Sequence, residues 1–261
     1  MKPAIHVNIA VKNLVPEDLR FLSVQGLHPE FYFSGDVLDE MSPEKLDALI
    51  RDTAEAKFVP TIHAPFYEMN LGAVDPRIRV VARERLHGTL DIAARFKASQ
   101  MVVHPGYGPW VFTKHISSWL GRAKDELAML VEKAGKLGIR LAFENIYDSH
   151  PADLASVIEP FSKEMVGVCF DAGHFNLFSE TSMKTWLEVL GPRIFEVHLH
   201  DNLGGDDDHI AVGDGTVKYG PLTDWLRKPG NRPILTLEME QKTHVIKSIP
   251  RVREWVAGIK D

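Results

Sequence analysis

Residues 139–144 read IRLAFE, residues 166–171 read VGVCFD and residues 194–200 read IFEVHLH. Each of these short runs is rich in Val, Ile, Leu or Phe, which is typical of buried strands, and each ends in a polar side chain. Two longer stretches with helical patterns, residues 151–161 and 181–190, separate the three runs. This alternation predicts parallel strands that are joined by crossover helices.

The same alternation extends to both ends of the chain. Five further strand-like runs are predicted at residues 4–9, 30–33, 59–64, 101–104 and 233–239, and five further helices at residues 43–56, 76–96, 117–137, 220–226 and 245–256. Eight strands with helices between them, at roughly 33 residues per unit, fit a closed (β/α)8 barrel better than an open sheet. We therefore expect an α/β fold that consists of a single TIM barrel domain over residues 1–261.

Length and composition agree with a folded globular protein. Of the 261 residues, 44% are hydrophobic and 25% are charged, which is ordinary for such proteins. The first residues, Met-Lys-Pro-Ala-Ile-His, lack the apolar segment typical of a secretion signal, and no stretch approaches the roughly 18 uninterrupted apolar residues of a membrane span. We therefore expect a cytoplasmic protein without a membrane partner. Cys169 is the only cysteine, which excludes an intrachain disulfide and a zinc site built from cysteines.

Potential metal ligands lie at the ends of six consecutive predicted strands. In such a barrel, functional groups lie at the carboxyl ends of the strands and in the loops that follow. The side chains of this kind are His63, His104, Glu144, Asp171, His174, His198, Asp207, His209 and Glu238. A single histidine after a strand is more often a loop or core residue, but six strands that each deliver His, Asp or Glu to one rim indicate a metal site. Imidazoles mixed with carboxylates suit Zn, Mn, Fe or Co.

The number of ligands exceeds the need of one ion. A catalytic zinc takes three or four protein ligands, whereas this rim offers about nine. Two or three ions can be accommodated if a carboxylate such as Glu144 bridges two of them. Ions about 4 Å apart can stabilise both the attacking and the leaving oxygen in phosphoryl transfer. The residues alone therefore indicate multi-metal hydrolysis.

Two ligand positions have close competitors. His200 replaces His198 if the strand register slips by two residues, and it otherwise orients neighbouring ligands. Glu240 competes with Glu238 in the same way. We favour His198 and Glu238.

Aromatic and glycine residues of the rim loops also have two interpretations. Tyr107, Trp110 and Tyr147 either line a sugar or base pocket or pack against neighbouring loops. Gly213 and Gly215 either let backbone amides approach a phosphate or form a plain turn, and we favour the turn.

These strand ends resemble the xylose-isomerase-like TIM barrels (AP endonuclease family 2), which include endonuclease IV and many sugar isomerases and epimerases. The resemblance spans most of the chain, and its motifs are His63-Ala-Pro-Phe66, His104-Pro-Gly106, Glu144-Asn145, Asp171-x-x-His174, His198-Leu-His-Asp201, Asp207-Asp-His209 and Glu238. The resemblance to endonuclease IV implies three zinc ions. The implied ligand sets are His63, His104 and Glu144 for the first ion; Glu144 as a bridge with Asp171, His198 and Glu238 for the second; and His174, Asp207 and His209 for the third. The simpler isomerases and epimerases keep mainly Glu144, Asp171, His198 and Glu238 around one ion.

The chain departs from endonuclease IV in two places. The first strand lacks the His-x-Ser-x-x-Gly-Gly element and matches only partly at His6. Residues 34–39 are expected to form an acidic loop without the basic and aromatic residues of a DNA-penetrating loop. Few cations occur in the rim loops, chiefly Lys12, Lys114 and Lys218, and the net charge is −6. DNA therefore has little support as a partner, whereas a small phosphoester or a sugar is compatible.

Three functional hypotheses follow. The leading hypothesis is a metal-dependent phosphoester hydrolase that resembles endonuclease IV, in which a metal-activated hydroxide near Glu144 attacks a phosphodiester. The alternative is a metal-dependent sugar or sugar-phosphate isomerase or epimerase, in which Glu144 and Glu238 exchange a proton beside a polarised carbonyl. The third is a metal-binding protein without catalytic activity.

Overall fold

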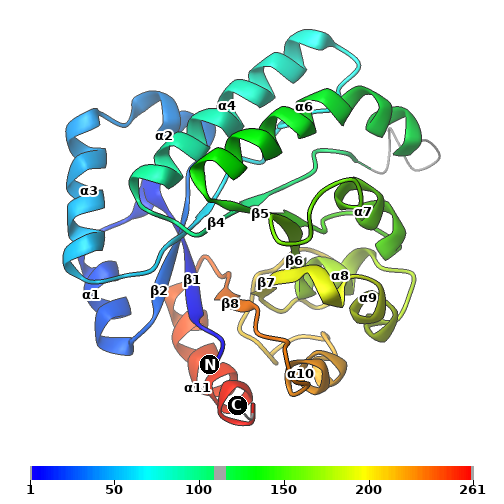
Figure 1. Cartoon of the computed structure of the whole chain (residues 1–261). Coiled ribbons are helices and arrows are strands. Elements are labelled where there is room, and N and C mark those ends of the chain that lie inside the picture. Colours follow the sequence, from blue (N-terminus) through cyan, green and yellow to red (C-terminus); the bar gives the residue numbers. More distant parts are fainter. Residues whose placement is uncertain (1, 109–115, 260–261) are drawn as a thin grey trace.

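Eight parallel strands close into a barrel in the computed structural model, which describes residues 2–108 and 116–259 (Figure 1). Each strand pairs with the next in sequence, and the last pairs with the first. The strands are β1 (Ile5–Ala10), β2 (His28–Tyr32), β3 (Thr61–His63), β4 (Gln100–Val103), β5 (Arg140–Glu144), β6 (Val166–Asp171), β7 (Ile194–Leu199) and β8 (Ile234–Leu237). The predicted (β/α)8 barrel is confirmed, and every predicted strand overlaps an observed one.

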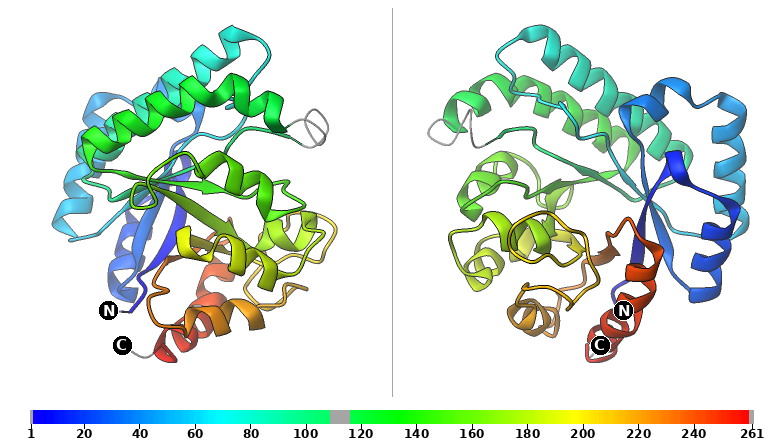
Figure 2. Two further views of the ribbon diagram at one scale, coloured as in Figure 1. Left: turned by 45° about the vertical axis from the view of Figure 1, so that its right-hand side comes forward. Right: turned by 180° about the vertical axis from the view of Figure 1, so that it is seen from behind.

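Helices surround the barrel, as Figure 2 shows from two sides. They are α1 (Pro16–Gln25), α2 (Gly35–Glu40), α3 (Pro43–Glu55), α4 (Pro76–Arg95), α6 (Ile116–Leu137), α7 (Pro151–Ile158), α8 (Ala172–Phe178), α9 (Met183–Val189), α10 (Gly220–Leu226) and α11 (Lys242–Ala257), with short 3-10 turns η1 (Val11–Asn13) and η2 (Gly191–Arg193). All seven predicted helices are present. Among the described residues, no helix combines the length and the apolar character needed to cross a membrane.

One local prediction is wrong. The segment 34–39, expected to be a loop, largely forms helix α2. The helix has only six residues, so its sequence covers less than two turns and shows no hydrophobic period that could be recognised. Helix α8, which has seven residues, was not predicted either. It begins directly after Asp171, whose side chain accepts a hydrogen bond from the backbone N–H of His174 at 2.6 Å.

The strands alternate between two environments. In β5, Leu141 and Phe143 belong to the main hydrophobic core between barrel and helices, whereas Ala142 packs in a separate small cluster with Val102 and Cys169. Since side chains alternate along a strand, Ala142 and the following even-numbered residue, Glu144, point into the barrel. The period of two thus directs the last residue of the strand toward the barrel axis, at the rim where the carboxyl ends of the strands meet.

Candidate metal centre

The nine predicted ligands all lie at the carboxyl-terminal rim of the barrel. They are placed as follows: His63, Glu144 and Asp171 end β3, β5 and β6; His198 lies in β7; His104 and Glu238 directly follow β4 and β8; His174 lies in α8; and Asp207 and His209 lie in the loop after β7. Their ligand atoms form groups whose members lie within 4.8 Å of one another. Three of these groups contain the three ligand sets that the resemblance to endonuclease IV implies, and one of the three also contains His200.

The first cluster consists of His63, His104 and Glu144. The Glu144 Oε2 atom lies 3.2 Å from Nε2 of His63 and 3.1 Å from Nε2 of His104. On the far side of its ring, His63 Nδ1 contacts the carbonyl oxygen of Ala64 at 2.8 Å. This contact fixes the ring so that Nε2 faces the cluster. Phe66 stacks on the ring of His104, with 4.6 Å between centroids, and so supports it from the side.

The second cluster consists of Glu144, Asp171, His198 and Glu238. The Nδ1 atom of His198 lies 2.9 Å from Glu238 Oε2, 3.6 Å from Glu144 Oε1 and 3.8 Å from Asp171 Oδ2. The side chain of Glu238 is 17% exposed, whereas the other three are buried, so this cluster is reached from solvent on the Glu238 side.

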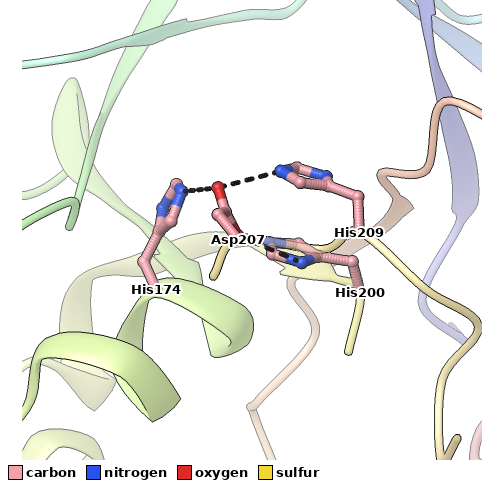
Figure 3. A group of neighbouring side chains, drawn as sticks. All are labelled: His174, His200, Asp207 and His209. Atoms are coloured by element: carbon pink, nitrogen blue, oxygen red, sulfur yellow. Dashed lines mark hydrogen bonds and ion pairs between the residues drawn. The ribbon is translucent and has the colours of Figure 1, made fainter. Parts of the chain in front are cut away.

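The third cluster consists of His174, His200, Asp207 and His209 (Figure 3). A single oxygen of Asp207, Oδ2, lies 3.1 Å from Nε2 of His174 and 3.1 Å from Nε2 of His209. The ring of His200 stacks on that of His209 at 3.8 Å between centroids. His209 has a φ of 47°, which is uncommon for a residue with a side chain and is found more often at functional sites.

Glu144 joins the three clusters through its two oxygens. Its Oε2 contacts the histidines of the first cluster, whereas its Oε1 lies 3.2 Å from Nδ1 of His174 and 3.6 Å from Nδ1 of His198. A carboxylate whose oxygens face opposite sides has the orientation that bridging of two ions requires.

Electrostatics favours charge separation throughout the centre. Burial alone would lower the pKa of His174, but Asp171, Asp207 and Glu144 outweigh it and raise that pKa well above its ordinary value. For His209, the neighbouring carboxylates likewise overcome burial and raise the pKa to about 9. Burial would raise the pKa of Glu144, but the surrounding histidines hold it well below its ordinary value. In the metal-free protein, protons on His174 and His209 therefore balance the carboxylates, and an ion would displace them, whereas burial lowers the pKa of His104.

The donor set fits divalent ions such as zinc. Although His198 Nδ1 and Glu238 Oε2 are only 2.9 Å apart, both are buried and neither makes a hydrogen bond of good geometry; the same is true of His200 Nδ1. Buried polar atoms without hydrogen bonds are rare and need an explanation, and donor atoms aimed at a shared ion provide one. Imidazole nitrogens with carboxylate oxygens are typical zinc ligands.

The structure also bears on the competing ligands. His198 pairs in register with Asp171 and lies in the second cluster, while His200 lies 3.1 Å from Asp171 and joins the third. Glu240 is exposed, in contrast to Glu238. The structure thus places His198 and Glu238 in the second cluster, and it adds His200 as a further candidate ligand of the third.

The rim aromatics and glycines have more ordinary roles. The Tyr107 hydroxyl donates to Asp148 at 2.5 Å, and its ring packs on Trp119. Tyr147 is 36% exposed and packs edge-on against Phe178. The Gly213 amide donates to Asp201 at 2.8 Å, which agrees with a turn. Trp110 and Lys114 lie outside the described residues.

Sequence reasoning missed two residues that support the centre. Asn145 exchanges two hydrogen bonds with the backbone of Asp171, at 2.9 and 2.8 Å, and so fixes the ends of β5 and β6 together. Glu30 is fully buried, and its Oε1 lies 3.1 Å from Nε2 of His198. The available signal for Glu30 was a carboxylate at the start of the predicted strand 30–33, directly before three aromatic residues, since buried charges are rare unless they are paired.

Comparison with known proteins identifies related chains. The family model described as "Xylose isomerase-like TIM barrel" matches residues 25–260. A protein named MJ1311 from Methanocaldococcus jannaschii is 27% identical over 230 residues, which cover 85% of this chain and 78% of that protein. A protein named probable endonuclease 4 from Acholeplasma laidlawii is 24% identical over 204 residues, 71% of this chain and 68% of the relative.

Two solved structures are similar over nearly the whole length. The TTHB071 protein from Thermus thermophilus, in a crystal soaked with ZnCl2, gives a TM-score of 0.84 at 27% identity and covers 98% of this chain and 99% of its own. A D-tagatose 3-epimerase-like protein gives a TM-score of 0.81 at 22% identity, with 98% and 97% covered. The second similarity shows the fold alone.

Proposed function

We propose that this chain, which belongs to the xylose isomerase-like TIM barrel family, is a metal-dependent phosphoester hydrolase. In this proposal it binds up to three divalent ions, most favourably zinc. The observation that supports hydrolysis is the third cluster. Proton transfer on a sugar needs only the second cluster, around one ion, and leaves His174, Asp207 and His209 without a role. In the structure, the two histidines converge on a single oxygen of Asp207.

The three clusters define which residues would hold ions. His63, His104 and Glu144 suit the first ion, Glu144, Asp171, His198 and Glu238 the second, and His174, Asp207 and His209 the third. Bound divalent ions would supply Lewis acidity and make hydroxide available near neutral pH. No protein nucleophile is then required, which agrees with the absence of a Ser or Cys nucleophile motif from the sequence.

The protein's own groups orient the reactants. Glu144 lies at the centre, remains ionised because its pKa is held low, and can accept a hydrogen bond from the attacking water. Glu238 also remains ionised, since His198 outweighs burial and lowers its pKa, and its partial exposure allows it to face substrate. The neighbouring carboxylates raise the pKa values of His174 and His209, so both carry protons in the metal-free protein.

A sugar isomerase or epimerase is the second candidate, and the charge of the rim favours it. Lys12, one of the few cations near the rim, is already paired with Asp36 at 2.5 Å. A substrate with little negative charge would suit such a surface. Glu144 and Glu238 lie on either side of His198 Nδ1, at 3.6 and 2.9 Å, so both carboxylates border the position where a single ion would polarise a sugar carbonyl.

Metal content and activity together separate the two functions. Elemental analysis of protein purified without chelators should give about three zinc ions per chain for the hydrolase and about one ion for the isomerase. The protein should then be tested on a small phosphodiester, on an abasic oligonucleotide and on ketoses in D2O. Hydrolysis is supported if the protein cleaves a phosphoester, His174→Ala abolishes the cleavage and His150→Ala preserves it. His150 is the control because it lies in the loop before α7 and its side chain is half exposed. Deuterium incorporation into a ketose that survives His174→Ala contradicts it.

A further inference from the structure

The barrel interior below the rim is unusually polar. TIM barrels mostly fill this space with layers of Val, Ile and Leu. Here several interior positions carry buried polar side chains, namely His6, Glu30, Thr61, Gln100, Glu196 and Thr236. Burying a carboxylate is costly unless it has partners, so the two glutamates among them require an explanation.

Glu30 lies directly beneath the second cluster. Its side chain is fully buried, and Oε1 accepts a hydrogen bond from Asn8 Nδ2 at 2.9 Å. The other oxygen, Oε2, accepts one from Thr61 at 3.3 Å. The carboxyl group also shares a hydrogen bond with Glu196. Oε1 of Glu30 lies 3.1 Å from Nε2 of His198, as an ion pair without the alignment of a hydrogen bond. Asn8 and Thr61 thus hold the carboxylate against the histidine.

His198 is thereby oriented from below. With Nε2 against Glu30, the opposite nitrogen, Nδ1, faces Glu238, Glu144 and Asp171. Other candidate ligands are oriented by neutral groups: Nδ1 of His63 contacts the Ala64 carbonyl at 2.8 Å, and Nδ1 of His209 contacts the Glu238 carbonyl at 2.8 Å. A carboxylate on the outer nitrogen makes an imidazole a stronger ligand than a carbonyl does, because it also stabilises positive charge on the ring.

We propose that Glu30 is a positioning residue of the metal centre, which fixes His198 with its proton on Nε2 and its free electron pair on Nδ1, and thereby strengthens the ion site of the second cluster. The proposal rests on the metal centre described above but on neither of the two reactions. Both need the second cluster, so Glu30 serves either one.

Glu196 provides a matched control in the same interior. It is fully buried like Glu30, and its carboxyl group contacts Gln100, Thr236 and Glu30 itself. Burial raises the pKa of Glu196 well above its ordinary value, so a glutamine there keeps both the neutral charge and a group that can donate a hydrogen bond to Glu30. Glu196→Gln therefore changes a buried glutamate of the same barrel without removing a contact to a candidate ligand. If zinc binding weakens in the Glu30 variants but not in Glu196→Gln, the loss is therefore specific to the pair of Glu30 and His198.

Zinc binding tests the proposal without measuring activity. The wild type, Glu30→Ala, Glu30→Gln and Glu196→Gln are each titrated with zinc against a chromogenic chelator. Loss of an outer-shell partner of this kind usually weakens metal binding about 10- to 100-fold. We expect a loss of this size for one ion in Glu30→Ala and a smaller loss in Glu30→Gln, which keeps an acceptor oxygen. Wild-type binding is expected in Glu196→Gln.

A second measurement uses the wild type and does not depend on the folding of variants. Nitrogen-15 NMR of the zinc-loaded protein should show the His198 proton on Nε2. A proton on Nδ1, or wild-type zinc affinity in a folded Glu30→Ala protein, would overturn the role of Glu30 alone. A wild-type protein that binds no zinc would overturn the metal centre, and this inference with it.

Discussion

The Oδ2 atom of Asp207 lies 3.1 Å from Nε2 of His174, although 33 residues separate the two in the sequence. The same oxygen lies 3.1 Å from His209, so Asp207 is the common partner of both histidines (Figure 3). It comes from the loop after β7, while His174 comes from α8. The third cluster therefore exists only when this loop is folded over the rim.

Asp207→Asn should remove one zinc ion per chain and leave the others in place. The substitution keeps the shape of the side chain but removes the charge that faces both histidines. Elemental analysis after dialysis in buffered zinc measures the loss. Asp206→Asn is the control, because Asp206 is an exposed neighbour in the same loop. A variant at position 207 that retains the wild-type number of ions would show that the third cluster does not hold one.

Glu144→Gln should affect two ions instead of one. Its two oxygens face different clusters, so neutralising it weakens both the first and the second ion site. Because the ions contribute several kcal/mol of transition-state stabilisation, we expect the activity, whichever it is, to fall by about 10³-fold or more. Metal content and turnover are measured on the same sample. Glu188→Gln on the exposed face of α9 should leave both unchanged, and a Glu144→Gln protein that loses a single ion would argue against bridging.

The barrel and most of the site were predictable because both depend on local patterns. Short strands rich in Val, Ile and Phe, separated by helices with a 3.6-residue period, determine the fold class. The period of two then places Glu144, Asp171 and His198 on the inner face. Helix α2 was not predictable, because its six residues do not complete two turns.

The support beneath the site was also beyond sequence reasoning. The contact of Glu30 with His198 joins strands β2 and β7, which face each other across the barrel. The order of the strands in the sequence does not show which side chains meet in this way. The membership of His200 in the third cluster depends in the same way on how the loop carrying Asp207 and His209 returns to the rim.

Asp148 should make the stability of the protein depend on pH in the mildly acidic range. It is buried beside Tyr107, and burial raises its pKa from 3.8 to about 6. Since the folded-state pKa exceeds the unfolded one, the stabilisation is complete below about pH 4 and is lost as the pH rises through 6. A shift of about two units corresponds to about 3 kcal/mol over the whole range.

Urea unfolding between about pH 4.5 and about pH 7.5 tests this assignment. Asp148→Asn should lose less stability than the wild type as the pH rises, because the amide does not ionise. Tyr107→Phe should lose more, because the Tyr107 hydroxyl lowers the pKa of Asp148 and its removal lets that pKa rise further. If the three proteins follow parallel curves, Asp148 is not the responsible group.

Gly106→Ala should destabilise the protein and disturb the first cluster, whereas Gly88→Ala should stabilise the protein. Gly106 has a φ of 84°, and a Cβ there would lie 1.9 Å from the carbonyl oxygen of Met69. Strain and overpacking together cost about 2 to 5 kcal/mol, and relief requires movement of the backbone two residues from His104. Gly88 lies inside α4 with no atom within 4 Å of an added Cβ, so alanine there should add about 1 kcal/mol through helix propensity. Urea unfolding measures the free energy of unfolding of both variants. If Gly106→Ala is as stable as the wild type, the loop after β4 does not approach Met69 this closely.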